Sequence, residues 1–194
     1  MIAFTANVQA NYKLGRDYGS LSKPLPIKQD GVVDVIEIFW YGCGHCFNLA
    51  PVVSNWAKQK DSSVNYQKMP VTWGPTHQLH AKLFYTIEAL GIAETGHSAV
   101  FTAIHKEGNF LASEAAIIDF LEKLGINKSE TIKYMNSFSV RQKVKRAIEI
   151  TKRFKVTATP MMFVDGQYRV EAKGGSSKML KVVDHVIEVQ KPIS

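Results

Sequence analysis

Cysteine is scarce in this sequence of 194 residues, which contains only two, and long apolar runs are absent. Two cysteines cannot form the several disulfides that hold a small secreted scaffold together, nor the four-thiolate site of a structural zinc ion. No apolar run approaches the roughly 20 residues that a membrane-spanning helix needs. Hydrophobic residues make up 45% and charged residues 21% of the chain, which argues against disorder and a coiled coil. The length suits one domain, or one domain that carries an insertion.

Acidic residues are outnumbered, 17 against 24 basic residues, and the basic excess is concentrated after residue 120. Nucleic-acid binding is one interpretation of such a cluster. Its basic members are Arg141, Lys143, Lys145, Arg146, Lys152, Arg153 and Lys155. Apolar residues recur among them at helical spacing from Val140 to Phe154, and the series of aromatic residues that a stacking platform requires is missing. We therefore interpret the cluster as the solvent-facing side of an amphipathic helix and expect no nucleic-acid partner.

The first ten residues are small or apolar for the most part and end in Val8-Gln9-Ala10. This small-x-small pattern is the kind that signal peptidase cleaves, so we interpret residues 1–10 as the remnant of an export signal. The alternative is an ordinary chain terminus. An exported chain works in an oxidising compartment, where disulfide chemistry is at home.

The first third of the chain has the pattern of a layered α/β sheet. Residues 23–26, Lys-Pro-Leu-Pro, suit an extended segment at a sheet edge, because proline cannot donate to a ladder. Residues 32–40 are almost continuously β-branched or aromatic, which predicts a strand buried on both faces. A helix over residues 43–60, interrupted by Pro51, and a second strand over residues 64–69 follow it.

The middle of the chain, residues 76–155, has the apolar spacing of consecutive helices and no strand pattern. Thr76, Ser113 and Asn127 are suitable N-caps for three of these helices, and the basic stretch over residues 140–154 is the last of them.

Strand patterns return near the end of the chain. Residues 161–164 and 167–172 predict a hairpin around a two-residue turn, Asp165-Gly166, and a last helix begins near Ser177. The whole order is β-β-α-β, a run of helices, then β-β-α.

Both cysteines of the chain lie in one Cys-x-x-Cys motif, Cys43-Gly44-His45-Cys46, directly after a buried strand and at the start of a helix. Unpaired N–H groups and the helix dipole favour an anion at this place. We therefore expect Cys43 to be the stabilised thiolate, with His45 as a second donor or positive neighbour. Cys46, one turn further into the helix, is placed to attack a mixed disulfide formed at Cys43.

Two other interpretations of the motif are weaker. A structural disulfide between these cysteines would close a very short loop, for which the gain in chain entropy is among the smallest. A metal site needs more ligands than two cysteines, and His77 and His80 would have to supply them. We interpret both histidines as ordinary helix residues and expect no metal.

A resemblance to a known family rests on four features. Residues 40–46, Trp-Tyr-Gly-Cys-Gly-His-Cys, resemble a thioredoxin-superfamily active site, and Thr159-Pro160 is similar to the cis-proline that faces it. The long helical insertion and the segment from Tyr12 to Tyr18 resemble the DsbA family of periplasmic disulfide oxidases. The resemblance implies an α/β, thioredoxin-like fold formed by residues 11–75 and 156–194, with an inserted all-helical domain at 76–155. Two positions depart from common family members: Gly44 stands where proline is usual, and Thr159 where valine is frequent.

The same resemblance implies the activity and the partners. It implies a thiol:disulfide oxidoreductase that introduces disulfides into reduced, unfolded exported proteins in the bacterial periplasm. The redox group is the Cys43–Cys46 disulfide, no further cofactor is implied, and a membrane DsbB-like quinone-linked oxidase reoxidises the protein, which we expect to be a monomer. A reductase or isomerase on the same scaffold and a non-enzymatic peptide-binding chaperone are the alternatives. The sequence sets neither the redox potential nor the substrates.

Supporting residues follow from the same comparison. Glu37 lies within the otherwise apolar strand and matches the position of a buried acid in this family, and Lys68 on the next strand is its expected charge partner. Such a pair can assist proton transfer at Cys46. Pro160 offers a backbone edge to which an extended substrate can add, and we expect the Thr159–Pro160 bond to be cis.

Overall fold

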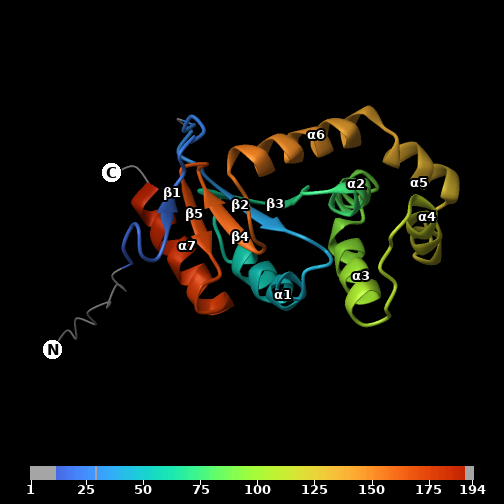
Figure 1. Ribbon diagram of the computed structural model, residues 1–194, viewed down its shortest axis with the longest axis horizontal. Coiled ribbons are helices and arrows are strands. Elements are labelled where there is room, and N and C mark those ends of the chain that lie inside the picture. The colour runs from blue at the N-terminus through green and yellow to red at the C-terminus, as the bar shows by residue number, and fades with distance from the viewer. Residues whose placement is uncertain (1–11, 29, 191–194) are drawn as a thin grey trace.

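The computed structural model describes residues 12–28 and 30–190 (Figure 1). The interpretation of residues 1–10 as a signal remnant lies outside this range. The elements, in chain order, are β1 (Gly19–Ser20), β2 (Val33–Phe39), α1 (Gly44–Lys58), β3 (Val64–Pro70), α2 (Pro75–Ala89), α3 (Ala93–His105), α4 (Glu114–Lys123), α5 (Lys128–Met135), α6 (Phe138–Arg153), β4 (Met161–Val164), β5 (Tyr168–Glu171) and α7 (Ser176–Gln190). None of these described helices is both long enough and apolar enough to cross a membrane.

The strands form one mixed sheet in the order β1-β5-β4-β2-β3. β2 is an interior strand, parallel to β3 and antiparallel to β4, and its register sets Glu37 opposite Lys68 on one side and Met162 on the other. Most of its side chains are buried, as the continuous apolar pattern predicts. This strand ends at Phe39, four residues before Cys43, so it delivers the Cys-x-x-Cys motif to the end of the sheet.

Helices cover both faces of the sheet. Val33 and Val35 of β2 pack with Leu49 and Val53 of α1 and with the buried face of α7. Ile38 packs on the opposite face against α6 and the residues that follow it. Figure 1 shows the same arrangement, with α1 and α7 on one side of the sheet and α6 on the other. The chain therefore has the three-layer architecture that its pattern predicts, and the fold is thioredoxin-like.

Five consecutive helices, α2–α6, occupy the chain between β3 and β4, and α2–α5 lie beside the sheet (Figure 1). We call residues 75–153 the helical segment. Ser113 and Asn127 cap their helices as predicted, by accepting hydrogen bonds from the N–H groups of Ala116 and Ser129. The prediction that Thr76 is a cap is wrong. The helix starts one residue earlier, at Pro75, because a proline is preorganised for the first helical position and has no N–H to satisfy.

The basic stretch is one face of α6. Val140, Ala147, Ile150 and Thr151 are buried, whereas the basic residues of the helix are exposed. The interpretation as an amphipathic helix with a solvent-facing basic side is confirmed.

Two edge details differ from the prediction. Strand pairing at the start of the chain occurs at β1, which precedes residues 23–26. The two prolines within residues 23–26 have no N–H to donate, so in this segment only the Leu25 N–H bonds to the hairpin, at Gly166 O. The hairpin connection has three residues, because Val164 pairs with Tyr168. Asp165 and Gly166 have φ of 50° and 59°, and the Gln167 N–H closes the turn onto Val164 O.

We expect Gly166→Ala to destabilise the protein by about 2–3 kcal/mol. The substitution places a Cβ in a left-handed conformation, which costs about 1 kcal/mol, and this Cβ would meet Leu25 Cβ at 2.8 Å. Gly31→Ala is the matched control, because Gly31 also has a positive φ, 74°, but nothing lies within 4 Å of its added Cβ. Denaturant unfolding should therefore show a loss of only about 1 kcal/mol for the control. Equal losses would contradict the steric part of this prediction.

Candidate active site at the start of α1

The motif residues lie where the sequence predicts them. Cys43 is the N-cap of α1, with an extended backbone (φ −89°, ψ 114°), and Gly44 is the first helical residue. The Cys43 N–H bonds Trp40 O at 3.0 Å, which closes the turn between β2 and the helix. The Cys43 sulfur then accepts a hydrogen bond from the Cys46 N–H at 3.3 Å. A sulfur atom thus takes the capping place that a serine or aspartate oxygen usually has.

The environment of Cys43 favours its thiolate. Hydrogen bonding from the Cys46 thiol, followed by bonds from the Thr159 side chain and the N–H groups of Cys46 and His45, lowers the pKa of Cys43 to about 5 against the opposing effect of burial. His45 itself is exposed, and the contribution seen in the structure comes from its backbone N–H. The expected role of the imidazole ring stays a prediction.

Cys46 has the opposite environment. It is 1% exposed, and the neighbouring Cys43 sulfur together with burial raises its pKa far above the ordinary range. The two cysteines have no disulfide between them here, so their pKa shifts apply to the dithiol state of the motif. The two sulfurs of one motif differ strongly in acidity, as a directional thiol–disulfide exchanger requires.

The Thr159–Pro160 segment is distant from the motif in the sequence but lies next to it in the structure. The Cys43 thiol lies 3.5 Å from Thr159 O, although 116 positions separate the two residues. The bond between Thr159 and Pro160 is cis, which confirms the expectation from the sequence. Pro160 leads directly into β4, so the sheet holds this backbone beside Cys43.

Glu37 is buried, at 2% exposure, but its nearest partner is not the predicted one. The Tyr66 hydroxyl donates to Glu37 Oε2, whereas among the described residues no ion pair within 4.0 Å joins Glu37 to Lys68. Lys68 acts on Glu37 only through its charge, which opposes the effect of burial; burial dominates and raises the pKa of Glu37. The sequence did offer a signal for Tyr66, because it lies two residues before Lys68 and so on the same face of β3.

Three histidines that the sequence did not mark as site residues surround the turn before Cys43. His80 accepts from the Trp40 indole N–H at 3.1 Å, the Tyr41 hydroxyl and His97 Nδ1 share a hydrogen bond, and His105 contacts Tyr41 O at 2.7 Å. Burial, and after it the charge of Lys68, lowers the pKa of His97 to about 3.

The alternative of a metal site gains no support from these histidines. Both ring nitrogens of His80 already have partners, Trp40 and Phe110 O. Within residues 12–28 and 30–190, no group of three metal-ligating side chains comes together.

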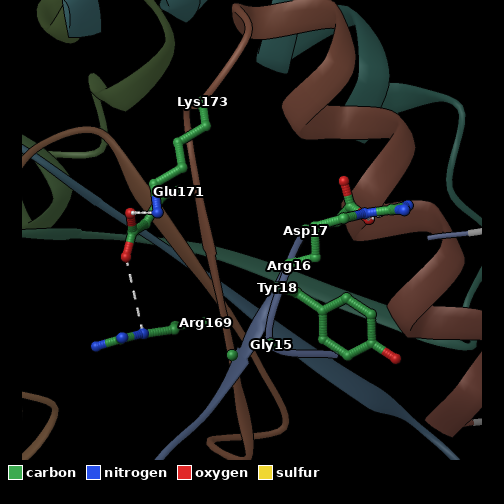
Figure 2. A pocket seen from close by; sticks show the side chains of 8 residues that line it. Gly15, Arg16, Asp17, Tyr18, Arg169, Glu171 and Lys173 are labelled. Carbon is green, nitrogen blue, oxygen red and sulfur yellow. Dashed lines mark hydrogen bonds and ion pairs between the residues drawn. The ribbon is translucent and has the colours of Figure 1, made fainter. Parts of the chain in front are cut away.

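A hollow that no residue of the motif lines lies at the edge of the sheet formed by β1 and β5 (Figure 2). It holds about 60 Å³, and its charges are paired with each other: Arg16 with Asp17, and both Arg169 and Lys173 with Glu171. With no cysteine or histidine in its lining, it is not a candidate for the chemistry of this protein.

We expect Cys43 to react with iodoacetamide with a midpoint near pH 5, while Cys46 stays unreactive, because only Cys43 is a thiolate at neutral pH. Thiolate absorbance as a function of pH checks this value. Cys46→Ala removes the thiol that contributes most to the low pKa, so the midpoint of that variant should rise. A wild-type midpoint near the free value of about 8.5 would contradict the assignment.

Comparison with known proteins agrees with this geometry. Residues 34–186 match the family model described as a DSBA-like thioredoxin domain. The chain is 34% identical to the thiol:disulfide interchange protein DsbA of Pseudomonas aeruginosa over 183 residues, 93% of this chain and 87% of that protein. It is 35% identical to the protein of the same name from Azotobacter vinelandii, covering 94% of this chain and 86% of the relative. The crystal structure of Pseudomonas aeruginosa DsbA superposes with a TM-score of 0.87 at 35% identity, covering 92% of this chain and 94% of that one. The chain therefore belongs to the DsbA-like thioredoxin domain family of thiol:disulfide oxidoreductases.

Proposed function

We propose that Cys43 and Cys46 are the nucleophilic and resolving cysteines of this oxidoreductase, and that it acts as an oxidase of reduced, unfolded exported proteins. The observation that carries the proposal is the position of Cys43 Sγ on the N-terminus of α1, 3.3 Å from the Cys46 N–H. Family membership supports thiol–disulfide exchange, and the difference in acidity between the two thiols supports the oxidising direction.

The reaction uses the Cys43–Cys46 disulfide as its only redox group and needs no other cofactor. A substrate thiolate attacks the Cys43 sulfur; the S–S bond to Cys46 breaks, and Cys46 leaves and takes up a proton, which its raised pKa favours. A second substrate thiolate then attacks the substrate sulfur of the mixed disulfide and releases Cys43 as a thiolate. The substrate loses two electrons and gains a disulfide, and the protein gains the two electrons as a dithiol.

The direction depends on the quality of Cys43 as a leaving group. A thiol with a pKa of about 5 leaves as a stable thiolate at neutral pH. Stabilisation of this thiolate is stabilisation of the reduced protein alone, because the disulfide has no thiolate. The free energy of the pair therefore favours giving the disulfide away.

The substrate binds, in this proposal, along the backbone that precedes β4. Thr159 O lies 3.5 Å from the Cys43 sulfur, so an extended peptide that adds to Thr159 and Pro160 holds its own cysteine next to Cys43. Main-chain hydrogen bonds of this kind require little sequence preference, which suits an enzyme that acts on many unfolded chains.

Glu37, with Lys68 beside it, is proposed as the proton-transfer group for Cys46. The alternation of β2 places Glu37 on the face that α1 covers, the helix that carries Cys46. Its raised pKa lets it hold or release a proton nearer to neutral pH than an ordinary carboxyl group. Tyr66 fixes its orientation through the hydrogen bond to Oε2.

The remaining parts of the proposal concern location and partners. The protein works as a monomer in the bacterial periplasm, and a membrane DsbB-like quinone-linked oxidase reoxidises it. Residues 11–75 and 156–194 form the thioredoxin-like domain, and residues 76–155 are its helical insertion. The uninterrupted order α2–α6 between β3 and β4 supports this division.

The deciding experiment is the equilibrium of the Cys43–Cys46 pair against glutathione. We expect a reduction potential close to about −120 mV, above the values of about −180 mV for protein disulfide isomerase and about −270 mV for thioredoxin. The oxidised protein should also transfer its disulfide to a reduced, unfolded model protein, and Cys43→Ser should lose this activity entirely while it keeps the fold. A potential near about −270 mV would identify a reductase and one near about −180 mV an isomerase, whereas full peptide-binding activity of Cys43→Ser would identify a chaperone.

The stability of the two redox forms should differ in a pH-dependent way. The pKa of Cys43 falls on folding from about 8.5 to about 5, so the thiolate adds stability that is complete above the unfolded pKa and lost as pH falls through about 5. We expect the reduced form to be the more stable at pH 7. Between pH 5 and 7 its advantage should grow by about 1–2 kcal/mol, a value reduced for the screening of a half-exposed sulfur. Denaturant unfolding of both redox forms at both pH values measures this difference in stability. A difference that does not change with pH would contradict the prediction.

Glu37→Gln should stabilise the protein at pH 7 and slow exchange several-fold. A raised carboxyl pKa means that stability present below the unfolded pKa of about 4.3 is lost as pH rises through the folded value, and glutamine removes this loss. The gain should therefore vanish near pH 4. Asp34→Asn on the same strand is the control; Asp34 is paired with Lys28 at 2.6 Å, so its loss should not stabilise. Wild-type exchange kinetics of the Glu37→Gln variant would show that Glu37 takes no part in the reaction.

A further inference from the structure

The turn that carries Cys43 is held by contacts from the helical segment. His80 of α2 binds the Trp40 side chain, His97 of α3 binds the Tyr41 side chain, and His105, the last residue of α3, binds the Tyr41 carbonyl group. These contacts span 40 to 64 positions of the sequence. All of them end on the two residues between β2 and Gly42, so the helical segment contacts the turn at its side chains and at its backbone.

His105 is distinct among the three because it contacts both sides of the Cys-x-x-Cys motif. Its Nε2 lies 2.7 Å from Tyr41 O, and since a carbonyl oxygen only accepts, Nε2 carries the proton and donates. Its ring also stacks on Phe47, with centroids 4.9 Å apart and planes 11° apart. Tyr41 precedes Cys43 by two residues, and Phe47 directly follows Cys46. One imidazole ring therefore fixes the backbone before the motif and the helix turn after it.

Few contacts within the turn itself fix its conformation. Its one closing bond runs from the Cys43 N–H to Trp40 O, at 3.0 Å. Gly42 contributes no side chain, and the Trp40 ring occupies the space where one would be: an added Cβ would lie 2.5 Å from Trp40 Cζ2. A turn built on glycine keeps more backbone freedom than any other. The position of Cys43 over the helix N-terminus thus depends on contacts from neighbouring elements.

We propose that His105 is a positioning residue that sets the stability of the Cys43 thiolate, and with it the redox equilibrium of the motif. The proposal rests on the function assigned to Cys43 above. In the oxidised protein the S–S bond itself ties Cys43 to Cys46, so the bracing by His105 is redundant. In the reduced protein only non-covalent contacts keep the Cys43 sulfur 3.3 Å from the Cys46 N–H. Loss of the brace therefore weakens the reduced form more than the oxidised form.

His105→Phe is the sharpest variant, because it keeps a flat ring on Phe47 and removes only the donor to Tyr41 O. We expect its equilibrium with glutathione to shift at least about fivefold towards the oxidised protein, and the pKa of Cys43 to rise. His105→Gln supplies a side-chain N–H again but no ring to stack on Phe47, so its equilibrium should lie between those of the wild type and His105→Phe. His185→Phe is the matched control: His185 is a half-buried histidine of α7 with edge contacts to Tyr12 and Tyr18, and its change should leave the equilibrium within about twofold of wild type.

The equilibrium with glutathione distinguishes a positioning role of His105 from a purely structural one. If His105 only supported the fold, His105→Phe would destabilise both redox forms equally and the glutathione equilibrium would stay at its wild-type value; that result would overturn the proposal. Should His105→Phe not fold, Phe47→Leu removes the ring on which His105 stacks and keeps the donor to Tyr41 O, and a shift in the same direction is required of it. The wild-type equilibrium tests the proposed function independently, because a reducing wild-type protein would refute the oxidase while the shift between wild type and variant still judges His105.

Discussion

The chemistry of this protein depends on one hydrogen bond, from the Cys46 N–H to the Cys43 sulfur at the N-terminus of α1. A helix start leaves N–H groups without partners and carries a partial positive charge. The hydrogen bond from the Cys46 thiol, together with these backbone N–H groups, stabilises a sulfur atom placed there as an anion and lowers the pKa of Cys43 to about 5. Most other features of the site serve to bring this sulfur to this place: β2 ends just before it, the turn at Trp40 closes onto it, and Thr159 lies against it.

The second constraint is that the two sulfurs must differ although they belong to one short motif. One helical turn achieves this, since Cys43 caps the helix at a half-exposed position and Cys46 points into the core at 1% exposure. The same contact between the sulfurs lowers the pKa of one and raises that of the other. Exchange then proceeds outward, because the accessible sulfur is the good leaving group and the buried sulfur is the one that protonates.

Much of the fold and the centre of the site could be predicted from the sequence, because these features are local. The buried strand, the cap at Cys43 and the basic face of α6 each follow from residues within about one or two turns of each other. Thr76 failed as a cap because Pro75 starts the helix more readily. Tyr66 as the partner of Glu37, and the histidines on Trp40 and Tyr41, could not be read from local pattern. They arise from strand register and from helix packing across 29 to 64 positions.

The helical segment is therefore part of the redox site in a physical sense. Phe39, Tyr41 and Cys46 belong to the same buried cluster as Phe84 and Phe101 of helices α2 and α3. The Cys43 sulfur and then burial raise the pKa of Cys46, and these helices contribute to that burial and to the bracing of the turn that carries Cys43. The solvent-facing side of Cys43 has to stay open for a substrate thiolate. The packing that orders the motif can therefore come only from the buried side, which Cys46 faces. A helical segment joined at the ends of β3 and β4 lies on that side, which links the position of the insertion in the chain to the difference in acidity between the two thiols.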